Sequence, residues 1–290
     1  MPMVQKTDVV LKRLRLGDKV QGLSKSQKAL GRFILRNYQR IAFMTIRQLA
    51  KASGLSEATI IRFVTALGFR GYPAFQKEIR IIVRTELKGP DRFKSTEETP
   101  RNARTLLQTV AEKEIENISH LQETVREGDL DQAVRAMASA ADIVIAGTRS
   151  TAPLAYHFSF GLAKLGKRVV RITAITTETY DLINRLDRQA LVVVIGFPRY
   201  LKELVDLLLF SKDKKLKTLT ITDSPFSPLQ GDIRLFSEAE STSFMGFHGA
   251  PMVLINTLIA ELSMLNNEKT LKELDRFEKI AKLRTYFYKA

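Results

Sequence analysis

The stretch MTIRQLAKASGLSEATIIRFVTALGFRGYPAF, residues 44–75, has the pattern of two helices joined by a tight turn. Gly54 can adopt the left-handed backbone that ends the first helix, and Ser56 is a good N-cap for the second. Apolar residues then recur at helical spacing and predict one buried stripe, formed by Ile60, Phe63, Val64 and Leu67. The stretch therefore predicts a helix-turn-helix.

The outward side of the second helix is short and carries one long cation. Ala58, Thr59 and Thr65 have small side chains, and Arg62 is the cation. Such a face lets a nucleic-acid backbone approach closely, as a recognition helix in the major groove of DNA requires. A generic helical hairpin would show the same glycine turn and apolar stripe, so this pattern alone leaves both interpretations open.

Positive charge is concentrated around this segment. Residues 1–100 contain 20 Lys and Arg against 8 Asp and Glu, a net charge of +12, whereas the remaining 190 residues contribute +3. Clustered cations favour a polyanionic partner, because each neutralised phosphate releases counterions, although solubility is an alternative explanation. Four cations flank the predicted helices within reach of phosphates: Lys51, Arg70, Lys77 and Arg80. Pattern and charge together favour DNA binding.

Composition narrows the class of protein. The chain has 290 residues, of which 44% are hydrophobic, and it has no cysteine, which excludes disulfides and thiolate catalysis. No apolar run reaches the roughly 18 residues of a membrane span, and charges interrupt the N-terminus where a signal peptide would be apolar. The three histidines are too scattered for a metal site, and His120 is expected at the surface. We expect a cytoplasmic protein with no membrane association and no cofactor.

The C-terminal half changes to short apolar runs separated by helical stretches. The runs are DIVIAG, RVVRI, ALVVVIG, KTLTIT and IRLF, between residues 142 and 236. This alternation predicts an α/β domain with a mainly parallel sheet covered on both faces by helices. Ligands bind beyond the carboxyl ends of such strands. Two loops are therefore candidates, GTRST at 147–151 after the first run and GFPRY at 196–200 after the third.

The first loop offers several groups that can hold an anion. Gly147 permits a tight turn, and Arg149 offers a positive charge just before a predicted helix. Hydroxyl groups come from three further residues, Thr148, Ser150 and Thr151. Hydroxyls and backbone N–H groups at the start of a helix can cradle a phosphate.

The second loop has a different chemistry. Pro198 removes a donor N–H, whereas the guanidinium of Arg199 can bind a phosphate or a carboxylate through two hydrogen bonds. With Tyr200 and His248, these residues complete the predicted ligand site. The alternative is that Arg199 pairs with a nearby acid such as Glu203 and holds nothing.

The segment that contains GLSEATIIRF and LGFRGYPAFQ resembles the N-terminal domain of the RpiR/MurR family of bacterial transcription regulators. The resemblance implies a dimer that reads palindromic, double-stranded operator DNA. It also implies which residues lie near base edges, namely Ser56, Thr59 and Arg62. Three others would lie nearer the DNA backbone, namely Lys51, Arg70 and Tyr72.

Residues from about 106 to 265 resemble the SIS domain, the sugar isomerase fold that this family uses to sense phosphosugars, on IAGTRSTAPLAYHFSFGLAKLGKRVV and TDSPFSPL. The resemblance implies that the stretch from Gly147 to Ser150 grips a phosphate. It also implies that the SIS domains pair, in a homodimer or homotetramer. The serine-rich loop S-x-S-G-x-[ST] of the family is replaced by IGFPRY, and Phe247 and His248 stand where Ser-Arg is usual. A phosphosugar is the favoured anionic ligand, and a carboxylate metabolite is its competitor.

Relatives with the SIS fold include isomerases, which need a general base. Glu178, Asp181 and His248 are the candidates, but none stands in a recognisable catalytic pattern. We therefore expect a ligand-responsive regulator and no enzyme, with a SIS-type sugar-phosphate isomerase as the alternative. The expected organisation is a helix-turn-helix domain over 1–88, a linker over 89–104, a SIS-like domain over 105–266 and an amphipathic helical tail over 267–290.

Overall fold

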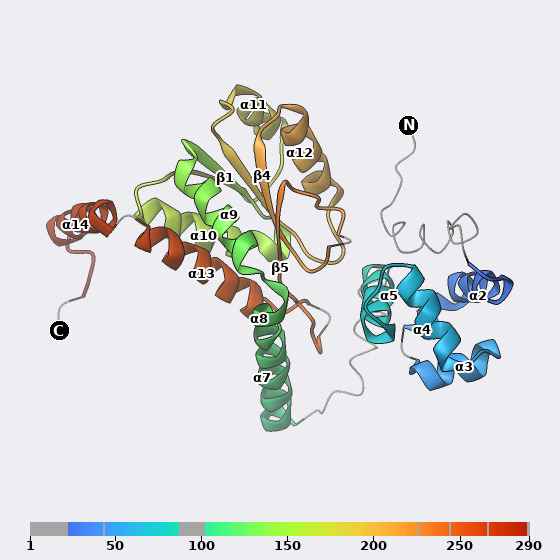
Figure 1. Cartoon of the computed structure of the whole chain (residues 1–290). Helices are drawn as coiled ribbons and strands as arrows, with labels where there is room; N and C mark the ends of the chain where they lie inside the picture. The colour runs from blue at the N-terminus through green and yellow to red at the C-terminus, as the bar shows by residue number, and fades with distance from the viewer. Residues whose placement is uncertain are drawn as a thin grey trace. The chain divides into compact units, whose positions relative to one another are not determined.

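The computed structural model describes residues 23–42, 44–86, 102–225, 227–243, 245–265 and 267–288. The chain divides into two compact units, residues 1–95 and 96–290. The described part of the first unit is helical, and the second combines a sheet with helices (Figure 1). The predicted fold class, an all-α helix-turn-helix domain followed by an α/β domain, is confirmed.

The described residues of the N-terminal unit form α2 (Lys25–Ile41), α3 (Ile46–Ser53), α4 (Glu57–Ala66) and α5 (Tyr72–Glu86). Capping boxes begin α2 and α3, where Ser24 and Thr45 each exchange hydrogen bonds with a glutamine three residues later. Gly54 ends α3 with a φ of 69°, the left-handed conformation that glycine adopts without strain. The turn between α3 and α4 therefore forms as its sequence predicts.

The core of this unit lies behind α4. This helix packs against α2, α3 and α5. Its predicted stripe is buried, because Ile60, Phe63 and Val64 have no exposed surface and Leu67 has 5%. Phe75 of α5 is also fully buried and meets the Phe69 ring edge-on. One side of α4 is therefore fixed by packing, and the other side faces away from this core.

The five apolar runs form one parallel sheet in the order β2-β1-β3-β4-β5. The strands are β1 (Asp142–Ala146), β2 (Arg168–Ile172), β3 (Leu191–Ile195), β4 (Lys217–Thr222) and β5 (Ile233–Phe236). β3, LVVVI, is buried at every position, as expected of a central strand with both faces covered.

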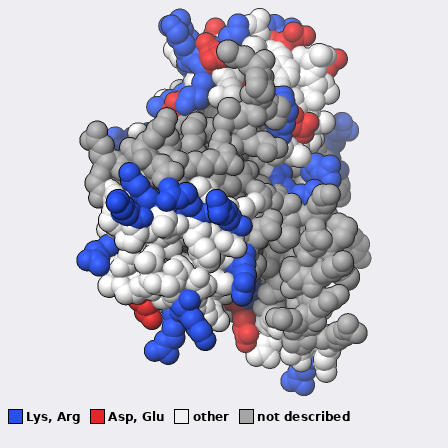
Figure 2. Space-filling view, turned by 90° about the vertical axis from the view of Figure 1, so that its right-hand side faces the viewer, with Lys and Arg blue, Asp and Glu red and all other residues white. Residues whose placement is uncertain are grey.

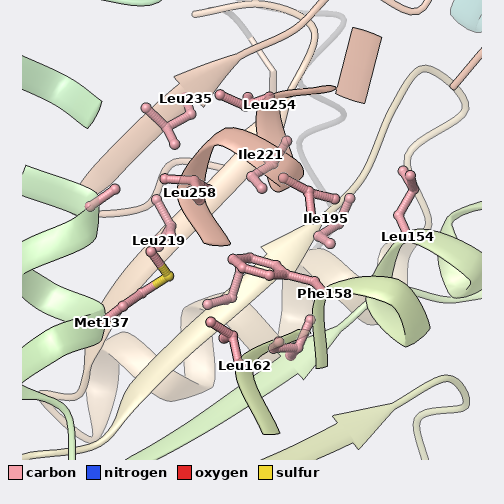
Figure 3. Close-up of a cluster of buried hydrophobic side chains, with 14 of the residues drawn as sticks. Met137, Leu154, Phe158, Leu162, Ile195, Leu219, Ile221, Leu235, Leu254 and Leu258 are labelled. Atoms are coloured by element: carbon pink, nitrogen blue, oxygen red, sulfur yellow. The ribbon is translucent and has the colours of Figure 1, made fainter. Parts of the chain in front are cut away.

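Alternate side chains of the strands pack on opposite faces of the sheet. One face packs under α9 (Glu127–Ser139), α10 (Ala152–Lys164) and α13 (Gly249–Met264). Figure 3 shows Met137, Phe158 and Leu258 from these helices around the strand residues Ile195, Leu219 and Ile221. The other face, with Val144, Val192 and Val194, packs under α11 (Thr177–Arg185) and α12 (Lys202–Asp213).

The strand order creates a switch point between β1 and β3. From β1 the chain crosses through α10 to β2 on one side, and it then returns through α11 to β3 on the other side. Right-handed crossovers in opposite directions place the two helices on opposite faces. The loops after β1 and β3 consequently diverge at neighbouring strand ends, which is where ligands bind in open α/β sheets.

Helices α7 (Ala103–Ser119) and α8 (Leu121–Thr124) precede the sheet. The Asn102 side chain caps α7, and α7 packs against α13. The predicted linker, 89–104, lies mostly outside the described residues, and its last two residues belong to α7.

Helix α14 (Asn267–Leu283) forms the predicted C-terminal helix. The Lys164 ammonium lies 3.0 Å from the centroid of the Phe277 ring, and Ala281 is buried. However, Leu271 and Leu283 of this amphipathic helix are 62% and 81% exposed, so they do not pack on their own domain in this structure. That they pack against a partner subunit, the alternative for such a helix, stays a prediction. No single helix in the described part of the chain is long and apolar enough to cross a membrane, and α13 with α14 reaches that length only across a 107° bend.

Candidate functional site

Helix α4 presents a polar face opposite its buried stripe. Ala58, Arg62 and Thr65 are exposed, and Thr59 is half-buried. At the start of the helix the Ser56 hydroxyl accepts a hydrogen bond from the Thr59 backbone N–H at 3.2 Å. The Ser56 and Thr59 hydroxyls also lie 2.9 Å apart, within hydrogen-bond distance of each other. Both hydroxyls therefore fix the first turn of α4 and lie at its surface.

The surroundings of this face are strongly basic. Residues 23–86 contain 12 Lys and Arg against 3 acidic residues. Lys51 and Arg70 are exposed, as the predicted phosphate contacts require. Figure 2 shows Lys and Arg side chains outnumbering acidic ones over the described part of the N-terminal unit.

Tyr72 corrects one sequence prediction. Its side chain is 6% exposed, and its hydroxyl donates a hydrogen bond to the Met44 carbonyl at 2.7 Å. Burial raises the pKa of Tyr72 to about 12, although the charge of Arg80 opposes the shift. The phosphate contact implied for Tyr72 is therefore wrong in this structure, because the side chain is packed inside the unit.

The turn between α2 and α3 is clamped by α5. Gln76 donates to the same Met44 carbonyl at 2.6 Å, and Arg80 Nε donates to the Ala42 carbonyl at 2.8 Å. Arg80 is thus half-buried and bonded to the backbone, contrary to the prediction that it reaches phosphates. These contacts fix the segment that leads into α3, the helix that precedes the turn at Gly54.

The two predicted ligand loops meet at the switch point of the sheet. The Thr151 hydroxyl is 3.0 Å from the Thr148 carbonyl and 3.2 Å from the Ile195 carbonyl at the end of β3, so it bridges both loops. Gly147 is needed for this approach, because a Cβ there would lie 2.8 Å from the Thr151 carbonyl oxygen. Thr151 is buried, and its hydroxyl is already hydrogen-bonded to backbone carbonyls of both loops.

Thr148 has a buried hydroxyl that no described residue satisfies. The residue is 3% exposed, and its Oγ1 has no hydrogen-bond partner. Leaving a buried hydroxyl unpaired costs about 1 to 3 kcal/mol. Most buried hydroxyls are bonded to the protein or to ordered water, so this one is open to a partner from outside the described residues.

Two arginines of these loops have left-handed backbones. Arg149 has a φ of 53° and Arg199 a φ of 68°, and both side chains are exposed. This conformation costs a residue other than glycine about 1 kcal/mol or more, and such strain collects at ligand sites. Within the described part of the chain, the guanidinium of Arg199 is exposed and forms no ion pair with Glu203. Ser150 is exposed beside Arg149, and Pro198 is half-buried beside Arg199.

Tyr200 anchors the second loop by a hydrogen bond to the protein. Its hydroxyl donates a hydrogen bond to the Asp223 carboxylate at the end of β4. Burial raises the pKa of Tyr200 well above its usual value, and the negative charge of Asp223 adds to the shift. The tyrosine hydroxyl predicted to bind the ligand is therefore bonded to the protein.

His248 precedes α13 and lies beside the second loop. Its ring centroid is 5.9 Å from that of Phe197, in the second loop. Burial lowers the pKa of His248, and the charge of Glu114 partly opposes this. The structure thus brings His248 to the loop after β3.

Glu114 of α7 was not predicted and lies at the same place. Its Oε1 accepts a hydrogen bond from the Gly249 N–H at 3.0 Å, at the start of α13. Its Oε2 is buried without a hydrogen-bond partner among the described residues. A Cβ on Gly249 would lie 2.5 Å from this Oε2. The only sequence signal was a glycine at the start of an apolar helix, which does not reveal a partner 135 residues away.

His120 was expected at the surface, and its side chain is 34% exposed, but it has a partner that the sequence did not predict. Its Nδ1 lies 3.0 Å from an oxygen of Glu238, whose side chain is 7% exposed. Nearby, Lys113 contacts Glu240 at 2.9 Å, and the Asn117 amide donates to the Glu240 backbone at 2.8 Å. These polar contacts join α7 to the segment that follows β5.

An open hollow of about 580 Å³ lies between the starts of α11 and α12. Its lining residues are Ile175, Thr176, Thr177, Tyr180, Leu201, Lys202, Glu203 and Asp206. Leu201, which lines the hollow, directly follows GFPRY in the sequence. None of the residues predicted to bind the ligand lines the hollow. Among the described residues, no group of three or more acidic or histidine side chains is placed to hold a metal ion.

Comparison with known sequence families agrees with the two units. The helix-turn-helix domain of the rpiR family matches residues 11–85, and the SIS domain matches residues 136–260. The chain belongs to the rpiR family. Its order of domains is the one that the sequence predicts.

The rpiR-family chain is similar to several curated regulators. An uncharacterized HTH-type transcriptional regulator of Caldanaerobacter subterraneus is 23% identical over 87% of this chain and 89% of the relative. Another, YfhH of Escherichia coli, is 26% identical over 53% of this chain and 55% of the relative.

Two solved structures share the fold of this family member. The sugar isomerase domain of the RpiR transcription factor from Sphaerobacter thermophilus has a TM-score of 0.59 at 23% identity, over 60% of this chain and 98% of that one. The NanR protein of Vibrio vulnificus complexed with ManNAc-6P has a TM-score of 0.59 at 17% identity, over 94% of this chain and 97% of that one.

Proposed function

We propose that this rpiR-family protein is a cytoplasmic transcription regulator that binds operator DNA through α4 and senses an anionic metabolite in its SIS unit. The observation that carries the proposal is the exposed polar face of α4, held from behind by a fully buried stripe in a basic unit.

The DNA contacts follow from the chemistry of this face. The guanidinium of Arg62 suits the two acceptors of a guanine in the major groove. Ser56, Ala58 and Thr59 belong to the first turn of α4, the part of a recognition helix that contacts base edges. Lys51 and Arg70 would neutralise phosphates, which contributes affinity without sequence preference.

Pairing of the protein would suit a palindromic operator. A helix-turn-helix dimer places two recognition helices about one helical turn of DNA apart. The SIS unit exposes apolar side chains on α10 and α13, namely Tyr156 at 56%, Phe160 at 51% and Val253 at 38%. We propose a homodimer or homotetramer that buries these residues.

The proposed ligand carries one acidic group and several hydroxyls, as a phosphosugar does. Its phosphate would be held by the Thr148 and Ser150 hydroxyls with Arg149 and Arg199. The unpaired Oε2 of Glu114 could accept a hydrogen bond from a sugar hydroxyl. The NanR protein, which has the same fold, is complexed with the phosphosugar ManNAc-6P.

A carboxylate metabolite is the second candidate, favoured by one observation. Pro198 lacks an N–H, so the loop after β3 cannot surround a phosphate with backbone donors as fully as a serine-rich loop would. The exposed guanidinium of Arg199 binds a planar carboxylate equally well.

We propose binding and not catalysis at this site. An isomerase needs a base with a pKa near the working pH. Hydrogen bonding from the Thr176 hydroxyl lowers the pKa of Glu178, which weakens it as a base. Glu178 and Asp181 are both exposed on α11, where they behave as surface carboxylates.

Helix α7 is the proposed connection between ligand and DNA. It is the first described element after the N-terminal unit, and its Glu114 contacts the start of α13 beside His248. A ligand that engages Glu114 would shift α7 and thereby the spacing of the two DNA-binding units. If a saturating ligand left operator affinity unchanged, this coupling would be wrong.

The test is a thermal-shift screen of wild type, Arg199→Ala and Glu114→Gln against phosphosugars that include ManNAc-6P, inorganic phosphate and small carboxylates. We expect a phosphosugar to raise the melting temperature of wild type and to do so less in both variants. Each stabilising compound is then added to operator-binding assays. Stabilisation by carboxylates alone would favour the second candidate, and stabilisation by no compound would contradict the ligand site.

A further inference from the structure

Ile61 is an exposed apolar residue of α4. It is 46% exposed, although the residues before and after it in the stripe, Ile60 and Phe63, have no exposed surface. Among the side chains described between residues 23 and 86, Ile61 is the one large hydrophobic residue that is exposed. The other large apolar side chains described there are buried fully or partly, so Ile61 stands out on a helix that we propose binds DNA.

The neighbours of Ile61 leave room for that partner. Ala58 lies three residues before it and Thr65 four residues after it, which places all three on one side of the helix. Both neighbours are exposed and have small side chains, so they do not shield the isoleucine. Its apolar surface is therefore accessible to solvent, and Arg62, the next residue, projects about 100° further around the helix.

The charges around this face identify the partner as a polyanion. Arg62, Lys51 and Arg70 are exposed, and the 92% exposed Arg47 lies 4.0 Å from the carboxylate of Glu57, the one acidic residue of α4. An apolar protein partner would have to cover these cations without compensation. In the major groove of DNA, by contrast, phosphates lie on both sides and the C5-methyl of thymine is an apolar group on the floor.

We infer that Ile61 contacts a thymine methyl and thereby specifies an A·T pair in each half of the operator. This inference rests on the proposed DNA binding and adds a base-specific residue to it. Arg62, the adjacent residue, would read a neighbouring base pair by hydrogen bonds. Burial of one methyl group against an apolar surface strengthens binding about fourfold.

The test removes the methyl group from the DNA and the isoleucine from the protein. The full chain first selects its site from a library of random duplexes. The selected site is then made with deoxyuridine in place of one thymine at a time, and each duplex is bound by wild type, Ile61→Ala and Ile61→Val.

We expect one thymine in each half-site whose replacement weakens wild-type binding about fourfold. Ile61→Ala should bind the thymine and uracil sites equally, whereas Ile61→Val, which keeps a branched apolar side chain, should retain the preference. Ile280→Ala is the matched control, because Ile280 is 47% exposed on α14, and it should retain the wild-type preference.

The possible failures are distinguishable. A selected site that tolerates every thymine replacement, or that contains no thymine in its half-sites, would overturn the role of Ile61 and leave DNA binding intact. If Ile61→Ala still preferred the thymine site to the uracil site, the role of Ile61 would likewise be wrong and DNA binding would remain intact. If no sequence were selected, the proposed DNA reading itself would be wrong, and the role of Ile61 with it.

Discussion

The two units hold their polar side chains in different ways. On α4, Ala58, Arg62 and Thr65 are exposed, and the packing that fixes them lies behind the helix. In the SIS unit, the Thr151 and Tyr200 hydroxyls are already hydrogen-bonded to the protein. A binding face made by one helix can therefore be recognised from its pattern of exposed residues. Where two loops meet, the residues that a motif identifies can be the ones that hold the loops together.

The largest expected effect tests whether the two units have separate hydrophobic cores. Phe63 and Phe158 are both fully buried, one behind α4 and the other under the sheet. We expect truncation of either to alanine to destabilise its own unit by about 3 to 5 kcal/mol. Calorimetry should show Phe63→Ala losing the transition of the DNA-binding unit and keeping that of the SIS unit. Phe158→Ala should do the reverse, and a single transition lowered equally by both would contradict two separate cores.

A second test compares two cations of the DNA-binding unit. Arg62→Ala should lower the discrimination between specific and random duplexes by about 1 to 3 kcal/mol. Lys51→Ala should weaken binding to all duplexes similarly, because a phosphate contact carries no sequence information. Binding measured on both kinds of duplex distinguishes the roles, and an equal loss on both for Arg62→Ala would contradict base reading.

Two threonines of one loop provide a matched pair in the SIS unit. Thr151→Val removes the hydroxyl that bridges two carbonyls, and we expect a loss of about 1 to 3 kcal/mol in the free energy of unfolding. Thr148→Val replaces an unpaired buried hydroxyl by a methyl and should leave stability unchanged or raise it, while it weakens ligand binding. Chemical denaturation and the thermal-shift assay measure the two effects. A strong destabilisation by Thr148→Val would show that its hydroxyl is already satisfied by the protein.

Tyr72 separates packing from DNA contact within the first unit. Tyr72→Phe loses the hydrogen bond to Met44 and should reduce stability by about 0.5 to 1.5 kcal/mol. It should leave the slope of log K for DNA binding against log salt concentration unchanged. Arg70→Ala, by contrast, should reduce the magnitude of that slope by about 1. If Tyr72→Phe reduced this slope as well, Tyr72 would contact a phosphate despite its burial.

The smallest effect concerns protonation of His248. Because burial lowers its pKa from the ordinary value of 6.5, the unfolded chain takes up a proton at a higher pH than the folded chain does. The free energy of unfolding should therefore decline as the pH falls through 6.5, and less so in His248→Gln. Thermal melts at several pH values measure the slope. A slope that is the same in both proteins would contradict a buried, neutral histidine.

Local patterns predicted the elements of both units. The five apolar runs are the five strands, and the residues from Gly54 to Leu67 form the predicted turn and helix. Each of these features depends on residues close together in the chain, such as a glycine that ends a helix or a serine that begins one. The positions of the two candidate ligand loops followed from the rule that ligands bind beyond the carboxyl ends of parallel strands.

Contacts between distant residues explain what the sequence did not predict. Tyr72 is buried because its hydroxyl bonds to Met44, 28 residues earlier, and His120 is half-buried because it meets Glu238, 118 residues later. Glu114 has no unusual sequence neighbours, and only the fold brings it to the start of α13. The role of a polar side chain therefore depends on its partner, which local spacing does not identify.

The contact between Glu114 and Gly249 has an evolutionary consequence. A side chain at position 249 would require the Glu114 carboxylate to move, since a Cβ would lie 2.5 Å from its Oε2, and the hydrogen bond from the Gly249 N–H would be disturbed. The two positions should therefore change together: descendants of this sequence that replace the glycine are expected to carry a shorter residue than glutamate at position 114. Lineages that keep the glutamate should keep the glycine as well, however far the rest of α13 has diverged.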